Sequence, residues 1–233
     1  TTPGVQVWVT GVLLQLAGLV ALNAGTRLWW VGLAAVLAVA LLLPRTRTLA
    51  AGLLVLPFLA LPIAKWATDA SLSGQLALVS SGVRYLAPAA LALWFLGKRR
   101  ASGALLRVGI AATFIGHGVK ALWVHPPYID LISNSATNLL GWQPAVAQIE
   151  VSLQLIGALD ILAGLAVLGL SLRVALFYMA VWGAVTALSR ITAGGWERLP
   201  DVLFRACHVA VPWVLLQATT ASKSPYRTPR LSD

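Results

Sequence analysis

Residues 150–169 read EVSLQLIGALDILAGLAVLG, and residues 172–193 read LRVALFYMAVWGAVTALSRITA. Each run is as long as a helix that crosses a hydrocarbon core of roughly 30 Å, which needs about 20 apolar residues. Neither run alternates polar and apolar residues as the strands of a membrane barrel do. The two runs therefore predict two transmembrane α-helices joined by a short loop.

The rest of the chain repeats this pattern. Of its 233 residues, 59% are hydrophobic and only 10% are charged, whereas about a quarter of the residues in soluble domains are charged. Further apolar runs, bounded by Gly, Pro, Asn or charged residues, occupy 5–22, 28–43, 48–66, 75–97, 104–124 and 200–220. We expect an all-α polytopic membrane bundle of about eight transmembrane helices.

Positive charge divides unevenly between the two sides of this predicted bundle. One side collects Arg45, Arg47, Lys98, Arg99, Arg100, Arg107, Arg173, Lys223, Arg227 and Arg230, with the single acid Asp233. The other side holds Arg27, Lys65, Lys120, Arg190 and Arg198 together with Asp69, Asp130, Glu150, Glu197 and Asp201. Because short cytoplasmic loops retain Lys and Arg, the first side is expected to be cytoplasmic, with both termini there. Loop asymmetry also accounts for the net charge of +10, so no nucleic-acid partner is expected.

The longest connection, residues 125–149, lies on the outer side in this frame. Pro126 and Pro127 end the fifth span, and the apolar and polar residues that follow suit a short helix lying on the membrane. It serves either as a structural cap or as a mobile lid. We expect an N-terminal four-helix half over 1–100 and a C-terminal four-helix half over 101–233, which carries this external segment and a basic cytoplasmic tail.

The two halves show a possible duplication. A shift of 124 residues places Arg84 and Pro88 of the fourth span on His208 and Pro212 of the eighth, and the third span on the seventh. Four plus four helices in this order would be parallel repeats about an axis along the membrane normal. Chance alignment of helices rich in Ala and Leu is the alternative.

Ionisable residues inside the spans cluster toward the outer side. At about 1.5 Å per residue, His117 and His208 lie roughly 10 to 12 Å from the outer ends of their helices, with Arg84 and Asp160 at similar depth. Charged side chains avoid lipid by facing the bundle interior. We therefore expect a ligand-binding pocket in the outer half of the last four spans, lined by His117, Lys120, Asp160, Arg190, Arg205 and His208.

Each of these residues also has a purely structural interpretation. Asp160 is expected to form a buried ion pair with Arg84 or Arg205, because a buried charge persists only when it is paired. Arg190 can extend to the outer interface. His117 and His208 can join helices as neutral hydrogen-bonding groups, and Gly116 and Gly118 can allow helices to pack closely.

Few kinds of chemistry are indicated. Equal depth of His117 and His208 would suit two axial ligands of one haem, but nothing else marks a haem pocket, so haem is disfavoured. Neither Lys65 nor Lys120 lies at mid-membrane, where a retinal-binding lysine would. The sequence holds no catalytic constellation, zinc motif or nucleotide loop, and its single Cys207 can form no intrachain disulfide.

The second half, about 104–220, resembles the DoxX-like group of bacterial membrane proteins, whose unit is a four-helix bundle. The resembling residues are Gly116-His117-Gly118, Ile156 to Ile161 around Asp160, Trp182 to Arg190, and Arg205 to His208 followed by Pro212. The group is named after a membrane subunit of a thiosulfate:quinone oxidoreductase. The resemblance implies the bacterial inner membrane, a four-helix unit and an association with quinone-linked redox systems.

Three functions follow from these observations. The first is a non-catalytic membrane subunit or binding module with an outward-facing polar pocket for a quinone or lipid, embedded in the bilayer beside other membrane subunits. The second is an electron-transfer subunit that binds haem or quinone through His117 and His208. The third is a small-molecule transporter, which the almost purely apolar inner halves of the spans disfavour.

Overall fold

The structure, a computed structural model, describes residues 3–23, 28–170 and 172–221, and within these ranges it contains helices and no strand. The first half comprises α1 (Pro3–Leu22), α2 (Leu28–Leu42), α3 (Arg47–Leu53), α4 (Val55–Thr68), α5 (Leu72–Gln75), α6 (Ala77–Ser80) and α7 (Gly82–Phe95). The second half comprises α8 (Arg99–Leu122), α9 (Pro126–Leu140), α10 (Val146–Gly169), α11 (Arg173–Gly194), η1 (Trp196–Arg198), α12 (Leu199–Leu203) and α13 (Ala206–Ala221).

Five helical segments in the described ranges are long and apolar enough to cross a membrane. They are Pro3–Leu22, Arg47–Thr68, Arg99–Leu122, Val146–Gly169 and Arg173–Gly194. Trp196–Leu203 and Ala206–Thr219, bent by 46°, together make a sixth if they are one span. The apolar helices Val31–Leu42 and Gly82–Phe95 are shorter. The described part of each apolar run is therefore helical, although three of the runs are divided between consecutive helices. The all-helical prediction is confirmed.

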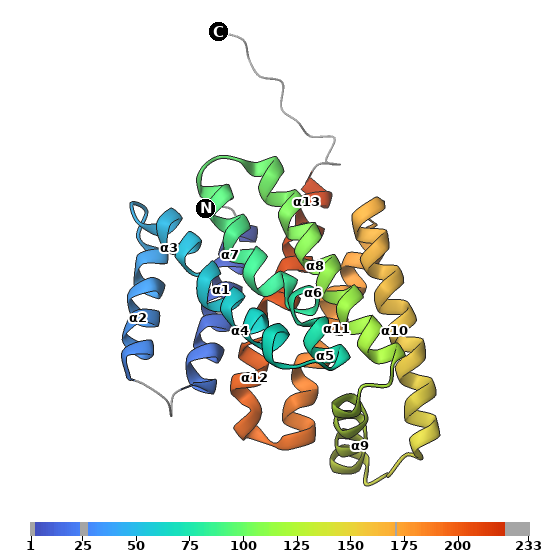
Figure 1. The fold of residues 1–233 in the computed structure, drawn as a ribbon. Helices are drawn as coiled ribbons and strands as arrows, with labels where there is room; N and C mark the ends of the chain where they lie inside the picture. Colours follow the sequence, from blue (N-terminus) through green and yellow to red (C-terminus); the bar gives the residue numbers. More distant parts are fainter. Residues whose placement is uncertain (1–2, 24–27, 171, 222–233) are drawn as a thin grey trace.

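The helices run up and down, so that their connections gather at two ends of the bundle. Figure 1 shows α1 beginning and α13 ending at the same end, where α2 joins α3, α7 joins α8 and α10 joins α11. This end carries Arg45, Lys98, Arg99, Arg100 and Arg173. The basic tail, with Lys223, Arg227 and Arg230, lies outside the described residues. Within the described residues, this end of the bundle is therefore basic.

The outward faces of α10 and α11 are apolar. Large hydrophobic residues spaced three or four apart are exposed on each helix: Val151, Leu155, Leu159, Leu162 and Leu165 on α10, and Val174, Phe177, Val181, Val185 and Leu188 on α11. Continuous apolar stripes of this length are rare on soluble monomers. They suit a surface surrounded by lipid.

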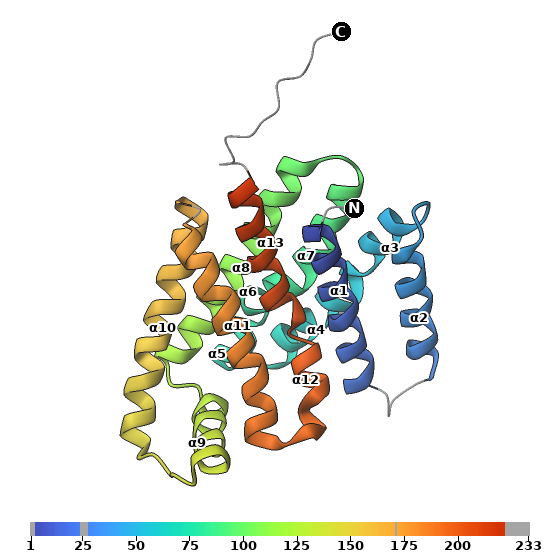
Figure 2. The same ribbon diagram turned by 180° about the vertical axis from the view of Figure 1, so that it is seen from behind.

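The first helix of each half packs on a broken helix of the other half. Gly18 of α1 touches the backbone of Phe204, where α12 meets α13, and Gly11 faces Ala210. In the same way, a β-carbon on Gly116 of α8 would lie 2.7 Å from the backbone nitrogen of Ser80, where α6 meets α7. Figure 2 shows α13 lying between α1 and α11. These exchanged contacts join the two halves.

Within the second half, α8 and α10 cross at unusually short range. A β-carbon on Gly118 would lie 2.6 Å from the carbonyl oxygen of Gly157, and the converse distance is also 2.6 Å. Gly164 faces the carbonyl oxygen of Ala111 in the next turns. Small residues allow helix backbones to approach where no hydrophobic driving force acts between them. Gly116 and Gly118 are therefore accounted for by helix packing.

Candidate functional site

A cavity of about 270 Å³ lies within the second half, toward the end of the bundle where α9 is located. It is enclosed by α8, α9, α10, α11 and the beginning of α13. The sequence-predicted residues His117, Asp160, Arg190, Arg205 and His208 all line it. The structure brings these five side chains together, and their role in ligand binding stays a prediction.

The contact between α11 and α13 positions three of these side chains. A β-carbon on Gly183 would lie 2.7 Å from the carbonyl oxygen of His208, so the two helices touch at this level. Arg190 follows Gly183 by two helical turns, and Arg205 precedes His208 by one. Because the helices are antiparallel, Arg190 and Arg205 lie on the outer side of this contact, and His208 lies deeper.

His208 is buried, and within the described structure neither ring nitrogen has a partner of good hydrogen-bond geometry. The residue is 5% exposed, and the backbone of Arg205, one turn earlier, offers its ring only a weaker contact. Its ring centroid lies 6.0 Å from that of His117, with 47° between the ring planes. Most buried polar groups in proteins are hydrogen-bonded. An unpaired imidazole that faces a cavity therefore indicates a place where a ligand or water binds.

His117 is held by α9. Its Nδ1 lies 2.7 Å from the hydroxyl of Tyr128. Burial raises the pKa of Tyr128 to about 12, so the phenol keeps its proton. The bond orients the imidazole toward α9.

Asp160 has a different partner from the one expected. The sequence predicted an ion pair with Arg84 or Arg205, but the carboxylate instead accepts a hydrogen bond of 2.7 Å from the Tyr178 hydroxyl on α11. In the described residues no cationic nitrogen lies within 4.0 Å of it. A neutral donor satisfies one carboxylate oxygen here. The prediction of the pair was wrong because it considered charged partners alone.

The two arginines are engaged elsewhere. Arg205 donates to the Asp201 carbonyl oxygen at 2.9 Å and lies 3.8 Å from the carboxylate of the same residue. The guanidinium of Arg84 lies 4.3 Å from the centroid of the Phe204 ring, a cation–π contact, and its buried Nε has no hydrogen-bond partner in the described structure. Both contacts form around the break between α12 and α13.

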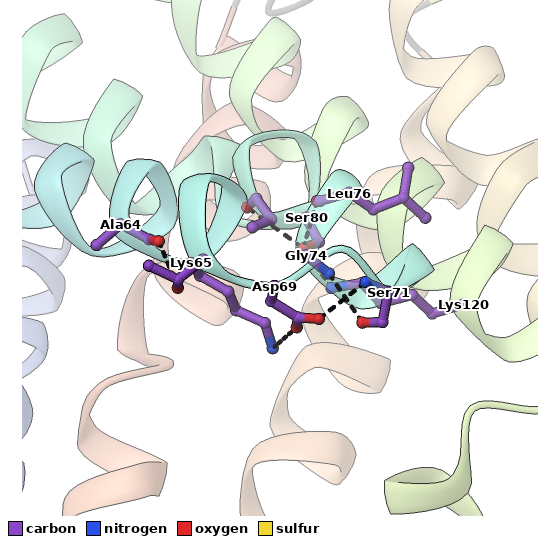
Figure 3. Close-up of polar contacts among 10 residues, drawn as sticks. Ala64, Lys65, Asp69, Ser71, Gly74, Leu76, Ser80 and Lys120 are labelled. Atoms are coloured by element: carbon purple, nitrogen blue, oxygen red, sulfur yellow. Dashed lines mark hydrogen bonds and ion pairs between the residues drawn. The ribbon is translucent and has the colours of Figure 1, made fainter.

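Lys120 does not reach the cavity. It was expected to line the pocket mouth, but its side chain turns to the first half, where Nζ donates a hydrogen bond of 2.7 Å to Ser80 of α6. Only 7% of the residue is exposed. Figure 3 shows Lys120 and Ser80 beside the surface cluster of Lys65, Asp69 and Ser71. Three residues separate Lys120 from His117, so the two lie on adjoining sides of α8, and the side of Lys120 faces Ser80 of α6 rather than the cavity.

Residues of α9, which the sequence placed in the external segment but not in the pocket, close the outer side. Tyr128, Leu131, Ile132 and Ser135 line the cavity at the spacing of one helical face. The Ser135 hydroxyl lies 2.8 Å from that of Thr192, and Asn138 donates to the Thr192 carbonyl oxygen at 2.9 Å. The apolar positions of this face were visible in the sequence, but its orientation needed the fold. Trp182 and Tyr178 were missed because neutral aromatic residues carry no such signal in a membrane span.

The cavity volume bears on the cofactor. Small-molecule pockets span about 300–1,000 Å³, so 270 Å³ suits a head group or one small ring and is too small for a porphyrin. Haem between His117 and His208 is therefore disfavoured. No group of three or more His, Cys, Asp or Glu side chains able to hold a metal ion occurs in the described part of the chain.

No family model, no curated protein and no solved structure matches this chain.

Proposed function

We propose that this protein is a non-catalytic membrane binding module whose second half holds a small amphiphilic ligand in an outward-facing pocket. The observation that carries the proposal is the cavity itself, which has apolar walls and a buried His208 with two unpaired nitrogens. Its polar lining is rich in donors, namely Arg190, Arg205, Trp182 and the imidazoles. Such a lining suits a ligand whose head accepts hydrogen bonds, as quinones and anionic lipids do.

The side of the second half away from the cavity is filled, which supports binding rather than transport. Leu106, Ile110, Val167, Leu176, Met179 and Val211 are each at most 3% exposed. A transporter of the same architecture needs a polar path or broken helices at this depth. The packed apolar core supplies neither.

We further propose that the two halves are parallel repeats and that the chain has eight spans. Each residue of α1 corresponds to the residue of α8 that lies 98 positions later in the chain. Each residue of α6 and α7 corresponds to the residue of α12 or α13 that lies 124 positions later. With these shifts the contact of Gly18 with Phe204 corresponds to that of Gly116 with Ser80. The contact of Gly11 with Ala210 corresponds to that of Gly109 with Leu86. Matching contacts at matching positions favour duplication over chance alignment.

The location and partners of the protein belong to the same proposal. The basic end of the bundle would face the cytoplasm of a bacterium and the cavity would face outward across its inner membrane. The resemblance to the DoxX-like group supports a role beside other membrane subunits of a quinone-linked complex. The pocket then receives its ligand from the outer leaflet.

The proposal is tested by filling the cavity. In Thr186→Phe a ring replaces a cavity-lining side chain, and Leu188→Phe, on the lipid-facing side of the same helix with 55% exposure, is the matched control. We expect wild type and the control, purified in non-ionic detergent, to retain the same co-purifying small molecule by native mass spectrometry. Thr186→Phe should lose it while staying folded. A molecule retained equally by all three proteins would contradict the proposed site.

A further inference from the structure

Positive charge exceeds negative charge around the cavity. Arg190 has neither an ion pair nor a hydrogen bond in the described structure, and its Nε is buried. Arg205 shares the carboxylate of Asp201 with Arg198, at 3.8 Å from each guanidinium. Arg84, which belongs to α7 of the first half, stacks on the face of the Phe204 ring, and this contact supplies no negative charge. Cations at this depth in a membrane require a counter-charge.

Asp160 does not supply that counter-charge. Its carboxylate is 5% exposed and bonds to Tyr178, and no cationic nitrogen lies within 4.0 Å of it in the described residues. Among the described residues, the one carboxylate that approaches an arginine of the cavity is Asp201, which is already shared. The described residues therefore leave the surplus of positive charge for a ligand to balance.

The hydrogen-bond donors of the cavity meet on one of its walls, and among them Arg205 already contacts Asp201. Arg190 projects from α11, and Arg205 and His208 are one turn apart at the beginning of α13, next to the contact with Gly183. Guanidinium groups bind carboxylates and phosphates through paired hydrogen bonds of fixed geometry. The unpaired His208 nitrogens lie at the inner end of the same wall and can donate a further hydrogen bond.

The opposite walls are apolar. Phe114 of α8, Leu131 and Ile132 of α9, and Leu153 and Ile156 of α10 line the cavity. A bare inorganic anion would leave these side chains facing water or empty space. An anion attached to a hydrocarbon chain would cover them.

We infer that the ligand of this cavity is an amphiphilic oxyanion, a carboxylate or phosphate on an apolar body, bound through Arg190, Arg205 and His208. The inference rests on the proposed function and makes it more specific, because a neutral quinone head would leave the surplus of positive charge in place. The oxyanion can belong to a membrane lipid or to a free small molecule.

Four probes distinguish the head from the body: octanoate, octyl phosphate, octan-1-ol and inorganic phosphate. Binding to the purified full chain is followed by quenching of tryptophan fluorescence, since Trp182 lines the cavity. Octanoate and octyl phosphate should bind at least about tenfold more tightly than octanol. Octanol cannot form charge-assisted hydrogen bonds, and about tenfold in affinity is what their absence is expected to cost. Inorganic phosphate should bind more weakly than octyl phosphate, and equal binding of the two would point to a free anion rather than a lipid.

Charge variants identify the residues. Arg190→Gln and Arg205→Gln should each weaken octanoate binding about tenfold or more, while Arg173→Gln, at the other end of α11, should leave it unchanged. Asp160→Asn should strengthen octanoate binding, because it removes a negative charge from the cavity. Weaker binding by Asp160→Asn would contradict the surplus of positive charge.

Two failures have different meanings. If octanol or a short-chain ubiquinone binds as tightly as octanoate and Thr186→Phe abolishes that binding, the oxyanion inference is overturned and the binding module stands. If no amphiphile responds to Thr186→Phe, both are overturned. Each variant is first checked for an unchanged elution volume and thermal midpoint, so that misfolding is separated from loss of a contact.

Discussion

The two halves of the molecule each enclose a cavity, and the two cavities differ in chemistry rather than in position. The first-half cavity, of about 150 Å³, is lined by Leu16, Leu19, Val20, Asn23, Leu33, Ala34, Leu37, Pro57, Ala60 and Leu61 of α1, α2 and α4. With the 98-residue shift, Leu16 corresponds to Phe114 and Leu19 to His117, which line the second-half cavity. Corresponding positions therefore line both cavities, and those of the second-half cavity carry more polar side chains.

The same comparison extends to the other helices. Leu37 of α2 lies four residues after Leu33, as Asp160 lies four after Ile156, and all four line their respective cavities. With the 124-residue shift, the buried Leu54 of the first half corresponds to Tyr178 of the second half. Because the first half packs without these polar groups, the fold does not require them. His117, which faces the cavity, is thus better explained by a ligand than by helix packing.

The contacts that the halves share should be equally indispensable. Gly18→Leu would drive a side chain into the backbone of Phe204, and Gly116→Leu into that of Ser80. Neither backbone can move without unpacking the other half, so each variant should lose about 3 kcal/mol or more of stability, the upper range for overpacking. The yield of monodisperse protein and the thermal midpoint in detergent measure this.

The controls are glycines with open space. Gly103→Leu in α8 and Gly32→Leu in α2 have nothing within 4 Å of an added β-carbon and should be tolerated. If Gly116→Leu is as stable as Gly103→Leu, the exchanged packing of the two halves is not what holds them together.

Much of this fold was predictable, because run length and charge dominate in membranes. The apolar runs located the helices, and the cost of charge in lipid directed His117, Asp160, Arg190, Arg205 and His208 toward one interior. Which polar side chains hydrogen-bond to one another was not predictable. The bond from Tyr178 to Asp160 depends on the rotation of α10 against α11, which their apolar sequences do not specify. The break before α7 falls at Ser80-Ser81-Gly82, a turn signal that hydropathy alone does not reveal, whereas the break before α13 carries neither proline nor glycine.

Exchanging the polar and apolar residues between halves should have opposite effects on stability. In the second half, Asp160→Leu combined with Tyr178→Phe removes the buried pair of groups together, which is often neutral or stabilising. In the first half, Leu37→Asp places a carboxyl group among leucines, where a charge costs about 2.5–3.5 kcal/mol. Leu37 is 7% exposed, and the described residues that line its cavity include no cation.

Thermal midpoints of the two variants in the same detergent give the comparison. We expect the second-half variant to match or exceed wild type and the first-half variant to fall well below it. A marked loss of stability in Asp160→Leu with Tyr178→Phe would mean that the polar groups serve the fold, and the contrast between the cavities would lose its functional meaning.

The smallest effect on stability is expected at Lys120. With the 98-residue shift, Lys120 corresponds to Leu22 of α1, which is 45% exposed. Because Lys120 is buried and Ser80 accepts its hydrogen bond, Ser80→Ala should cost about 1–2 kcal/mol by leaving a buried cation without a partner. Lys120→Met should cost less, since its hydrocarbon can fill the same space. In the double variant, adding Ser80→Ala to Lys120→Met should cost almost nothing more, so the two changes are not additive.

Octanoate affinity should stay at the wild-type value in all three variants, because the Lys120 side chain turns away from the cavity. A loss of affinity in Lys120→Met alone would return this lysine to the pocket, as the sequence had suggested.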